Sequence, residues 1–358
     1  MRVAILAAGG FTRATAKTAI GVLRYAPYPV IAVIDPDRAG TDAAEHVGVG
    51  EGVPVVGTVA EALARGADVV LVGTAAAGGR IPDSYRPFLA EALRRGVAVW
   101  NGSHERVLDD PALREAARSG NGSVRELREP PADLPIGGHR RPREGATVVL
   151  TVGTDAAVGK MTVALEIVAA LRRAGARADF VATGQTGIAI AGKGICVDAV
   201  VADFIAGAAE QMVCDAAESA DWVVVEGQGS LTHPGFSGVT LGLLHGTAPH
   251  LMVLCHDGNR MVMKGYDREG LPVRTLEECV RLYEEAAAWR MPPGYPRARV
   301  VAVALNTAGS GEDITARWIR DASARTKLPA ADPIREGHAG ADRLANALIQ
   351  ARVTIDTR

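Results

Sequence analysis

The sequence predicts an α/β protein built from two parallel-sheet domains, the second of which carries a phosphate-binding loop. Three observations lead to this prediction. Short apolar runs alternate with longer helical patterns, a stretch rich in proline, glycine and charge interrupts them at 128–145, and a glycine-bounded loop with a lysine follows an apolar run at 153–162. Alternating strand and helix patterns fold into parallel sheets covered by helices. The interruption therefore predicts a linker between two such domains.

The first domain is expected over residues 1–127. It begins with the apolar run VAILAA, and helical patterns separate the apolar runs that follow. This order is typical of a Rossmann-like sheet, because parallel neighbours need a crossover between them. Polar, glycine-rich segments at 73–82 and 101–104 close two strands, where open sheets usually bind ligands. Strands are predicted at 3–8, 30–35, 67–73 and 96–102, and helices near 14–25, 58–65, 84–95 and 111–118.

The first domain lacks the glycine pattern of a dinucleotide site. Its first loop, AAGGFTRATAKTA, has no G-x-G-x-x-G to bring a pyrophosphate against a helix N-terminus. Asp35 ends the second predicted strand, where an acid either binds a ribose or caps a turn. We therefore expect no NAD here, and expect this domain to pack against the catalytic one or to hold part of the substrate.

The second domain is expected over residues 146–358, after the linker at 128–145. Its first strand, 146–153, runs into the phosphate loop, and the helix that follows stops at Gly175. Strands and helices then alternate again, so this domain is predicted to be a P-loop NTPase-like α/β fold. Further strands are predicted at 178–184, 221–227, 250–256 and 298–306, with helices near 160–174, 203–219 and 276–289.

Charge and composition argue against several classes of function. The net charge is -2 over 358 residues, with no long block of one sign, so the positive field that attracts nucleic acid or anionic membranes is missing. No apolar run approaches the roughly 18 residues of a membrane span. The four cysteines form no CxxC pair. We expect a soluble protein of the reducing cytoplasm, without nucleic-acid or membrane partners.

A phosphate-binding loop is predicted at GTDAAVGKMT. Two glycines allow the tight turn that points successive N–H groups and a helix N-terminus at one anion, and the lysine supplies a point charge. Five residues rather than four separate the glycines, and Met161 stands where Ser or Thr usually binds magnesium, with Thr162 one place later. The residues expected to bind a nucleotide are Gly153, Thr154, Asp155, Ala156, Ala157, Val158, Gly159, Lys160, Met161 and Thr162.

The loop resembles that of dethiobiotin synthetase, the cobyrinate amide synthetases and the MinD-like ATPases, in which GTD, a short spacer and VGK recur. VVVEGQGS at 223–230 resembles the strand end where those enzymes carry an acid before glycines. The resemblance implies ATP and Mg²⁺ as ligands, with Glu226 on the metal or its water shell and Asn306 against the adenine. It does not extend to carbamate phosphorylation, because the strand ending VATGQTG offers no lysine before Lys193.

Longer motifs resemble one bacterial P-loop family that includes proteins described as D-glutamate N-acetyltransferases. The motifs are GTDAAVGKMT, ATGQTGIAIAG, VDAVVADFIAGAAE, DWVVVEGQGSLTHPGFSGVTLGLLHG and LCHDGNR, and with KTAIGVLRY the likeness covers nearly the whole chain. It implies a transferase or ATP-dependent ligase acting on an amino acid or carboxylate, with an acidic amino acid as substrate. Members are often labelled NAD-dependent epimerases, which the first loop does not support.

Polar residues near the predicted strand ends are candidates for the chemistry. His256 follows the apolar run LMVLC and is the favoured general base. Asp203 either binds magnesium or caps a helix. The segment THPGFSGVTLGLLHG is expected to be a loop close to a ligand, with Thr240 among its contacts. The predicted catalytic residues are Lys160, Glu226, His256 and Gln185, the metal ligands Thr162, Glu226 and Asp203, and the substrate-binding residues Thr186, Asp198, Gly227, Gln228, Ser230, His233 and Ser237.

Two enzyme mechanisms and one non-catalytic role follow from these residues. In the favoured mechanism, ATP and Mg²⁺ activate a carboxylate as an acyl phosphate, and an amine then takes the acyl group. In the second, acetyl-CoA supplies the acyl group and the loop binds the phosphates of CoA. A nucleotide switch like MinD would need a signature lysine, which Thr154–Val158 lacks. The expected partner is a small amino-acid or carboxylate substrate, and the chain is expected to form a homo-oligomer.

Overall fold

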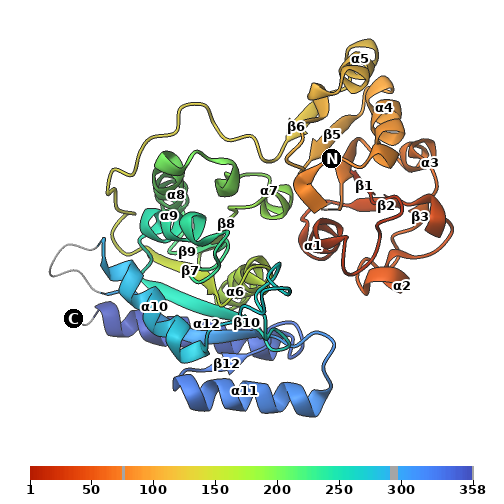
Figure 1. Ribbon diagram of the computed structural model, residues 1–358. Coiled ribbons are helices and arrows are strands. Elements are labelled where there is room, and N and C mark those ends of the chain that lie inside the picture. Colours follow the sequence, from red (N-terminus) through yellow and green to blue (C-terminus); the bar gives the residue numbers. More distant parts are fainter. Residues whose placement is uncertain (75–76, 291–296, 357–358) are drawn as a thin grey trace. The chain divides into compact units, whose positions relative to one another are not determined.

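The computed structural model describes residues 1–74, 77–290 and 297–356 and separates into two compact units. The first unit comprises Met1–Glu129 and Gln185–Cys196, and the second comprises Pro130–Gly184 and Val197–Arg358. Within the described residues each unit holds one six-stranded parallel sheet (Figure 1). The predicted fold class is therefore confirmed. The division predicted from the sequence, at 1–127, 128–145 and 146–358, does not assign residues 185–196 to the first unit, to which they belong in the structure.

The sheet of the first unit has the strand order β3-β2-β1-β4-β5-β6. This is the order of a Rossmann-like fold, whose topological switch lies between β1 and β4. The unit contains β1 (Val3–Leu6), α1 (Lys17–Tyr25), β2 (Val30–Ile34), α2 (Ala43–Val47), β3 (Val55–Val56), α3 (Val59–Ala64), β4 (Val69–Val72), α4 (Arg86–Arg94), β5 (Ala98–Asn101), α5 (Pro111–Gly120), β6 (Val124–Glu126) and α7 (Gln185–Ala191).

Helices cover both faces of the first unit's sheet. α3, α4 and α5 share one face, where Leu89 and Leu113 pack with Leu6 in a single buried cluster. α1 lies on the other face with α7 beside it (Figure 1). α7, which follows β8 of the second unit in the chain, thus adds to the second helical layer of this sheet.

The sheet of the second unit has the order β12-β11-β10-β7-β9-β8. β7, which leads into the phosphate loop, pairs with β10 on one side and with β9 on the other. The unit contains β7 (Thr147–Gly153), α6 (Lys160–Arg173), β8 (Ala178–Val181), α8 (Ala202–Ala217), β9 (Trp222–Val225), α9 (Ser237–Thr247), β10 (Leu251–Asp257), α10 (Leu276–Ala288), β11 (Arg299–Asn306), α11 (Glu312–Thr326), β12 (Ala330–Ala331) and α12 (His338–Asp356).

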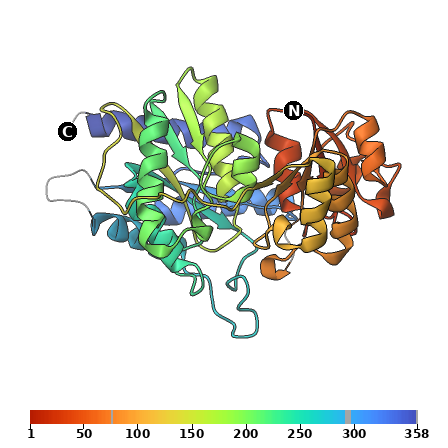
Figure 2. The same cartoon turned by 90° about the horizontal axis from the view of Figure 1, so that it is seen from above.

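Two helical layers also enclose the second sheet. α6 packs beside α12 on one face, while α8 packs on α9 and α10 on α11 across the other (Figure 2). The seven residues of β7 are all buried between these layers. In the described part of the chain, no helix combines the length and the apolar character that crossing a bilayer requires.

The glycine-rich segment expected to be a loop is mostly the helix α9, so the expectation of a loop is wrong, while its closeness to a ligand stays a prediction. A Cβ atom on Gly246 would lie 2.3 Å from the Ala206 carbonyl oxygen, and one on Gly242 would lie 2.8 Å from Cγ2 of Ile205. Glycines four residues apart lie on one face of a helix. Here that face lets α9 approach the backbone of α8.

The predicted linker has no regular secondary structure beyond Leu127, as expected. It is nevertheless packed onto α8. A Cβ atom on Gly207 would lie 1.8 Å from the Pro135 carbonyl oxygen, and the Gly138 N–H donates to Glu210 Oε1 at 3.2 Å. The absence of a side chain at position 207 therefore leaves the space that this segment occupies.

Candidate functional site

The phosphate loop joins the end of β7 to the start of α6, as the sequence predicts. Gly159 has a φ of 103° and Ala157 a φ of 57°. The left-handed region costs glycine nothing but costs an L-residue roughly 1 kcal/mol. α6 begins without a side-chain cap. Its first N–H groups are therefore open to an anion.

Lys160 is the first residue of α6, and its side chain folds back over the loop. Nζ donates to the Asp155 carbonyl oxygen at 2.9 Å. It would lie 2.8 Å from a Cβ atom on Gly153, so only glycine leaves room for the ammonium there. Burial lowers the pKa of Lys160 to about 8, although the nearby acidic groups, Glu226 among them, raise it. Solvent does not reach this buried ammonium. A bound phosphate would supply the negative charge that balances it.

Glu226 follows β9 directly and is buried. Its Oε2 accepts the backbone N–H of Thr183 at 3.1 Å and of Gly184 at 3.3 Å. Burial raises the pKa of Glu226 to about 7, against the opposing effect of these N–H groups and of Lys160. β7 and β9 are neighbours, so Lys160, which follows the loop after β7, and Glu226, which follows β9, lie near enough for the charge of each to shift the pKa of the other.

We expect the wild-type chain to lose stability relative to Glu226→Gln as the pH rises from about 5 to about 7. The folded-state pKa of Glu226, about 7, exceeds the ordinary value of 4.5. The folded state therefore binds more protons in this window, and its stability falls as the pH rises through it. The effect should approach roughly 3 kcal/mol. Urea denaturation of both proteins at three pH values measures it, and parallel pH profiles would contradict it.

Gly227 brings the segment after Glu226 against β7. Its N–H donates to Thr151 Oγ1 at 2.9 Å. A Cβ atom at this position would lie 1.6 Å from the Thr151 carbonyl oxygen and 3.0 Å from Cδ of Lys160. The structure thus explains this glycine by close backbone approach, and its predicted contact with substrate stays a prediction.

Gly227→Ala is expected to destabilise the chain by about 3 kcal/mol or more, because overpacking here meets backbone that cannot move away. It should also weaken phosphate binding by displacing Lys160. Gly238→Ala is the matched control, since its Cβ atom would meet nothing within 4 Å in α9. Thermal unfolding of both variants measures the difference. Equal midpoints would show that the contact at position 227 is relieved without cost.

Tyr283 on α10 is a site residue that no motif in the sequence indicates. Its hydroxyl donates to the Gly153 carbonyl oxygen at 2.8 Å and accepts the Leu231 N–H at 3.2 Å. Burial raises its pKa to about 12, and Ser230, a predicted substrate ligand, bonds to it. A tyrosine on the apolar face of an amphipathic helix gives no signal beyond core packing. Here it fixes the start of the phosphate loop.

His256 and Asn306 lie at the carboxyl ends of β10 and β11. Nδ1 of His256 is 2.9 Å from Thr154 Oγ1, and burial lowers the pKa of the imidazole, which keeps it neutral. The strand order places His256 and Asn306 on one side of β7 and Glu226 on the other. All three share the carboxyl edge of the sheet, as expected. Their roles as general base, adenine ligand and metal ligand stay predictions.

The predicted metal ligands come from separate elements. Thr162 is half-buried in the first turn of α6, whereas Asp203 is exposed in the first turn of α8. α8 has no side-chain cap, so the alternative that Asp203 caps it is not observed. Asp198 is exposed in a short 3₁₀ turn. Among the described residues, no three His, Cys, Asp or Glu side chains gather as a metal group. A magnesium site would need oxygen ligands from the phosphates themselves.

Gln185 and Thr186 begin α7 and belong to the first unit. The hydroxyls of Thr186 and Thr18 are 2.9 Å apart. Cγ of Gln185 lies 2.9 Å from the position of a Cβ atom on Gly102, within the predicted rim of the first sheet. Their predicted catalytic and substrate-binding roles stay predictions.

Two further candidates, Thr240 and His233, form hydrogen bonds with backbone atoms. Thr240 donates to the Gln228 carbonyl oxygen at 2.8 Å. His233 is buried, with Nδ1 accepting the N–H two residues later at 3.1 Å and Nε2 facing the Lys264 carbonyl oxygen at 3.1 Å. Ser237 is the first residue of α9. His233 thus fixes a loop with both ring nitrogens, and the substrate-binding roles of Gln228, His233 and Ser237 stay predictions.

Asp35 in the first unit shows the capping alternative. Its Oδ1 accepts the Gly9 N–H at 3.0 Å, and its Oδ2 pairs with Arg38 at 2.9 Å. Its carboxylate also caps the 3₁₀ turn after β2. Both oxygens are therefore engaged inside the unit. Ala75 and Ala76, part of the predicted ligand rim, lie outside the described residues.

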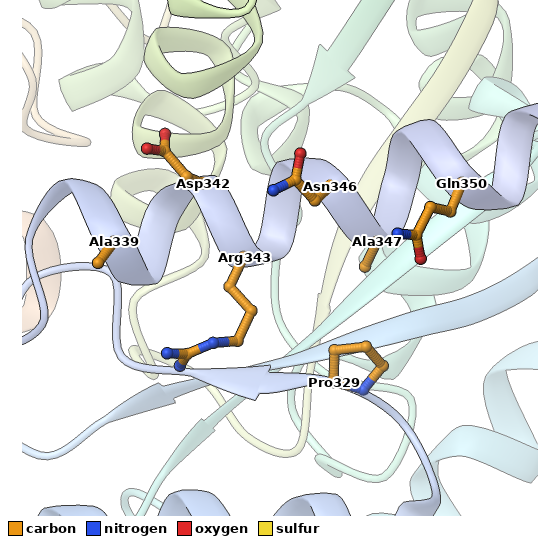
Figure 3. A pocket seen from close by; sticks show the side chains of 7 residues that line it. All are labelled: Pro329, Ala339, Asp342, Arg343, Asn346, Ala347 and Gln350. Atoms are coloured by element: carbon orange, nitrogen blue, oxygen red, sulfur yellow. The ribbon is translucent and has the colours of Figure 1, made fainter.

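A groove of about 380 Å³ runs between α12 and the chain before β12 (Figure 3). Arg343 crosses it, donating to the Ala330 carbonyl oxygen at 3.3 Å and pairing with Glu336 at 2.9 Å. None of the predicted site residues lines this groove, so it is separate from the phosphate loop. The lining residues are Pro329, Ala339, Asp342, Arg343, Asn346, Ala347 and Gln350.

Two family models match the chain. A model described as a domain of unknown function (DUF1611_C), P-loop domain, matches residues 135–345. A second, described as a DUF1611_N Rossmann-like domain, matches residues 36–130. The chain belongs to the DUF1611 family. The predicted order of a Rossmann-like domain and a P-loop domain is that of the DUF1611 models.

Known DUF1611 relatives resemble the chain over most of its length. A crystal structure of a DUF1611 family protein from Anabaena variabilis is 38% identical, with a TM-score of 0.87 over 98% of this chain and 99% of that one. A protein of Tritonibacter scottomollicae named D-glutamate N-acetyltransferase is 35% identical over 93% of this chain and 94% of its own. One of Pseudoalteromonas with the same name is 36% identical over 78% and 82%. The predicted family resemblance is therefore confirmed.

Proposed function

We propose that this chain acylates the amino group of a small acidic amino acid, with D-glutamate as acceptor, and that ATP and Mg²⁺ activate the acyl group. One observation carries the proposal. The buried ammonium of Lys160 and the buried carboxyl of Glu226 interact electrostatically at the carboxyl edge of the sheet, beside an uncapped helix N-terminus. The names of the two D-glutamate N-acetyltransferases support the choice of acceptor.

The residues would divide the chemistry as follows. A carboxylate oxygen of acetate attacks the γ-phosphorus of ATP, which forms acetyl phosphate and releases ADP. The amine nitrogen then attacks the carbonyl carbon, the C–O bond to phosphate breaks, and inorganic phosphate leaves. Lys160 and the N-terminus of α6 neutralise the transferred phosphoryl group. His256, which burial keeps neutral, takes the proton of the amine.

Magnesium, when bound, would supply further positive charge to the phosphates. Glu226 and Thr162 are the residues of this chain that would hold it. Glu226 interacts electrostatically with Lys160, and Thr162 follows Lys160 by two residues in α6. Glu226 is suited to this role because burial raises the pKa of its carboxyl to about 7, and a cation bound beside it would lower that pKa and favour the anion.

Acetyl-CoA as the acyl donor is the second candidate, and Met161 favours it. Methionine stands where a hydroxyl usually reaches the metal. A loop without that hydroxyl suits phosphates that bind without magnesium, such as those of CoA. The thioester carbonyl would then be attacked directly by the amine, releasing the thiol of CoA, and no nucleotide would be consumed.

The test compares the two donors on one acceptor. Purified chain is incubated with D-glutamate and either ATP, Mg²⁺ and acetate or acetyl-CoA, and N-acetylglutamate is measured by mass spectrometry with ADP measured alongside. Product with stoichiometric ADP supports the first candidate, and product from acetyl-CoA alone supports the second. L-Glutamate tests the acceptor, and Lys160→Met is the inactive control. Product from neither mixture contradicts the proposed function.

A further inference from the structure

Asp155, the third residue of the phosphate loop, faces a neighbouring loop. Its carboxylate is completely buried. It accepts the backbone N–H of Lys264 at 2.8 Å and the guanidinium of Arg260 at 2.8 Å, besides the N–H of Ala156 at 2.6 Å. Asp155 therefore fastens the segment that follows β10 to the phosphate loop.

Lys264 is held at both of its peptide groups. Asp155 binds its N–H, and Nε2 of His233 lies 3.1 Å from its carbonyl oxygen. The His233 ring is itself fixed, stacked on Phe236 with 4.4 Å between ring centroids and edge-on to Tyr266 at 5.4 Å. The backbone at position 264 is therefore set beside the third residue of the phosphate loop.

The side chain of Lys264 contrasts with this fixed backbone. It is exposed, and within residues 1–74, 77–290 and 297–356 its ammonium forms no ion pair. Arg260, by comparison, pairs with Asp155 and with Asp257 at 3.3 Å. Of Arg260 and Lys264, which both donate to the Asp155 carboxylate, Lys264 is the one whose charge stays available.

A second positive charge beside the phosphate loop would favour the binding of a ligand with several phosphates. Met161 provides no hydroxyl for a metal, and Lys160 supplies one positive charge to a ligand whose phosphates carry several negative ones. We propose that Lys264 is a second cation of the phosphate site, presented to the ligand by the contacts that Asp155 and His233 make with its backbone. The proposal rests on the proposed function, because it requires a phosphate ligand in the loop.

The test measures binding of two probes, ATP and inorganic tripolyphosphate, by calorimetry. Lys264→Met should weaken both by about tenfold, because a charge-assisted hydrogen bond contributes on that scale. Lys264→Arg should restore most of the affinity. Arg268→Met is the matched control, since Arg268 is exposed on the same loop and, within the described residues, its backbone forms no hydrogen bond like those of Lys264, and it should bind like the wild type. Unchanged thermal unfolding of Lys264→Met confirms that its fold is intact.

The outcomes separate the two proposals. If the wild type binds neither ATP nor tripolyphosphate, the ATP-dependent form of the proposed function fails and this inference fails with it. If the wild type binds both and Lys160→Met does not, but Lys264→Met binds like Arg268→Met, the loop is a phosphate site and Lys264 is not part of it. Weakening by Lys264→Met alone, reversed by arginine, supports the inference.

Discussion

Lys160→Met is expected to weaken the binding of ATP and tripolyphosphate by at least about 100-fold, because charged hydrogen bonds to phosphate in a buried site contribute about 3 kcal/mol or more. The ammonium is buried over Gly153, where little water reaches it. Methionine keeps the apolar stem that packs near Gly227, so the substitution removes the charge and little else. Calorimetric titration measures the loss.

Proton uptake gives this prediction a second readout. The pKa of Lys160, about 8 in the free protein, should rise when an anion binds beside it. Near pH 8 the wild type should therefore take up a fraction of a proton with each phosphate ligand. Titrations in buffers of different ionisation enthalpy report that uptake. Wild-type affinity and unchanged uptake in Lys160→Met would show that the phosphates bind elsewhere.

The phosphate loop and Glu226 are predictable from sequence because each follows an apolar strand, and parallel strands bring their carboxyl ends to one edge. Once the strand order is known, it identifies which residues are neighbours along that edge. Tyr283 and Asp155 are different. Their roles depend on which backbone groups come within hydrogen-bond distance after α10 and the segment around Lys264 have packed. No spacing in the sequence encodes those contacts.

For a related reason, the sequence pattern does not predict the helices α7 and α9. α9 contains glycines at 238, 242 and 246, which disfavour an isolated helix by about 1 kcal/mol each. Close packing against α8 outweighs that cost at 242 and 246, where a side chain would collide with α8, whereas a Cβ atom on Gly238 would meet nothing within 4 Å. α7 has only seven residues, too few to show a helical period.

Contacts within the first unit hold α7 in position. Tyr28 donates to the Ala189 carbonyl oxygen at 2.7 Å, and the guanidinium of Arg125 donates to that of Gly192 at 2.8 Å. Ile188 and Ile190 are buried. The segment leaves from Gly184 and returns at Val197, whose N–H donates to the Thr183 carbonyl oxygen at 3.0 Å. This hydrogen bond therefore holds the two ends of the segment close together.

Replacing residues 185–196 by a Gly-Gly linker is expected to unfold the first unit and spare the second. Two buried isoleucines and the covered face of the sheet contribute about 5 kcal/mol, which is comparable to the whole stability of many domains. The hydrogen bond between Thr183 and Val197 lets so short a linker close. Hydrogen exchange should show residues 1–129 unprotected, while tripolyphosphate still binds at Lys160. Ile188→Ala, a graded control, should cost about 3 kcal/mol. Full protection of residues 1–129 after the replacement would mean that α1 alone covers this face of the sheet.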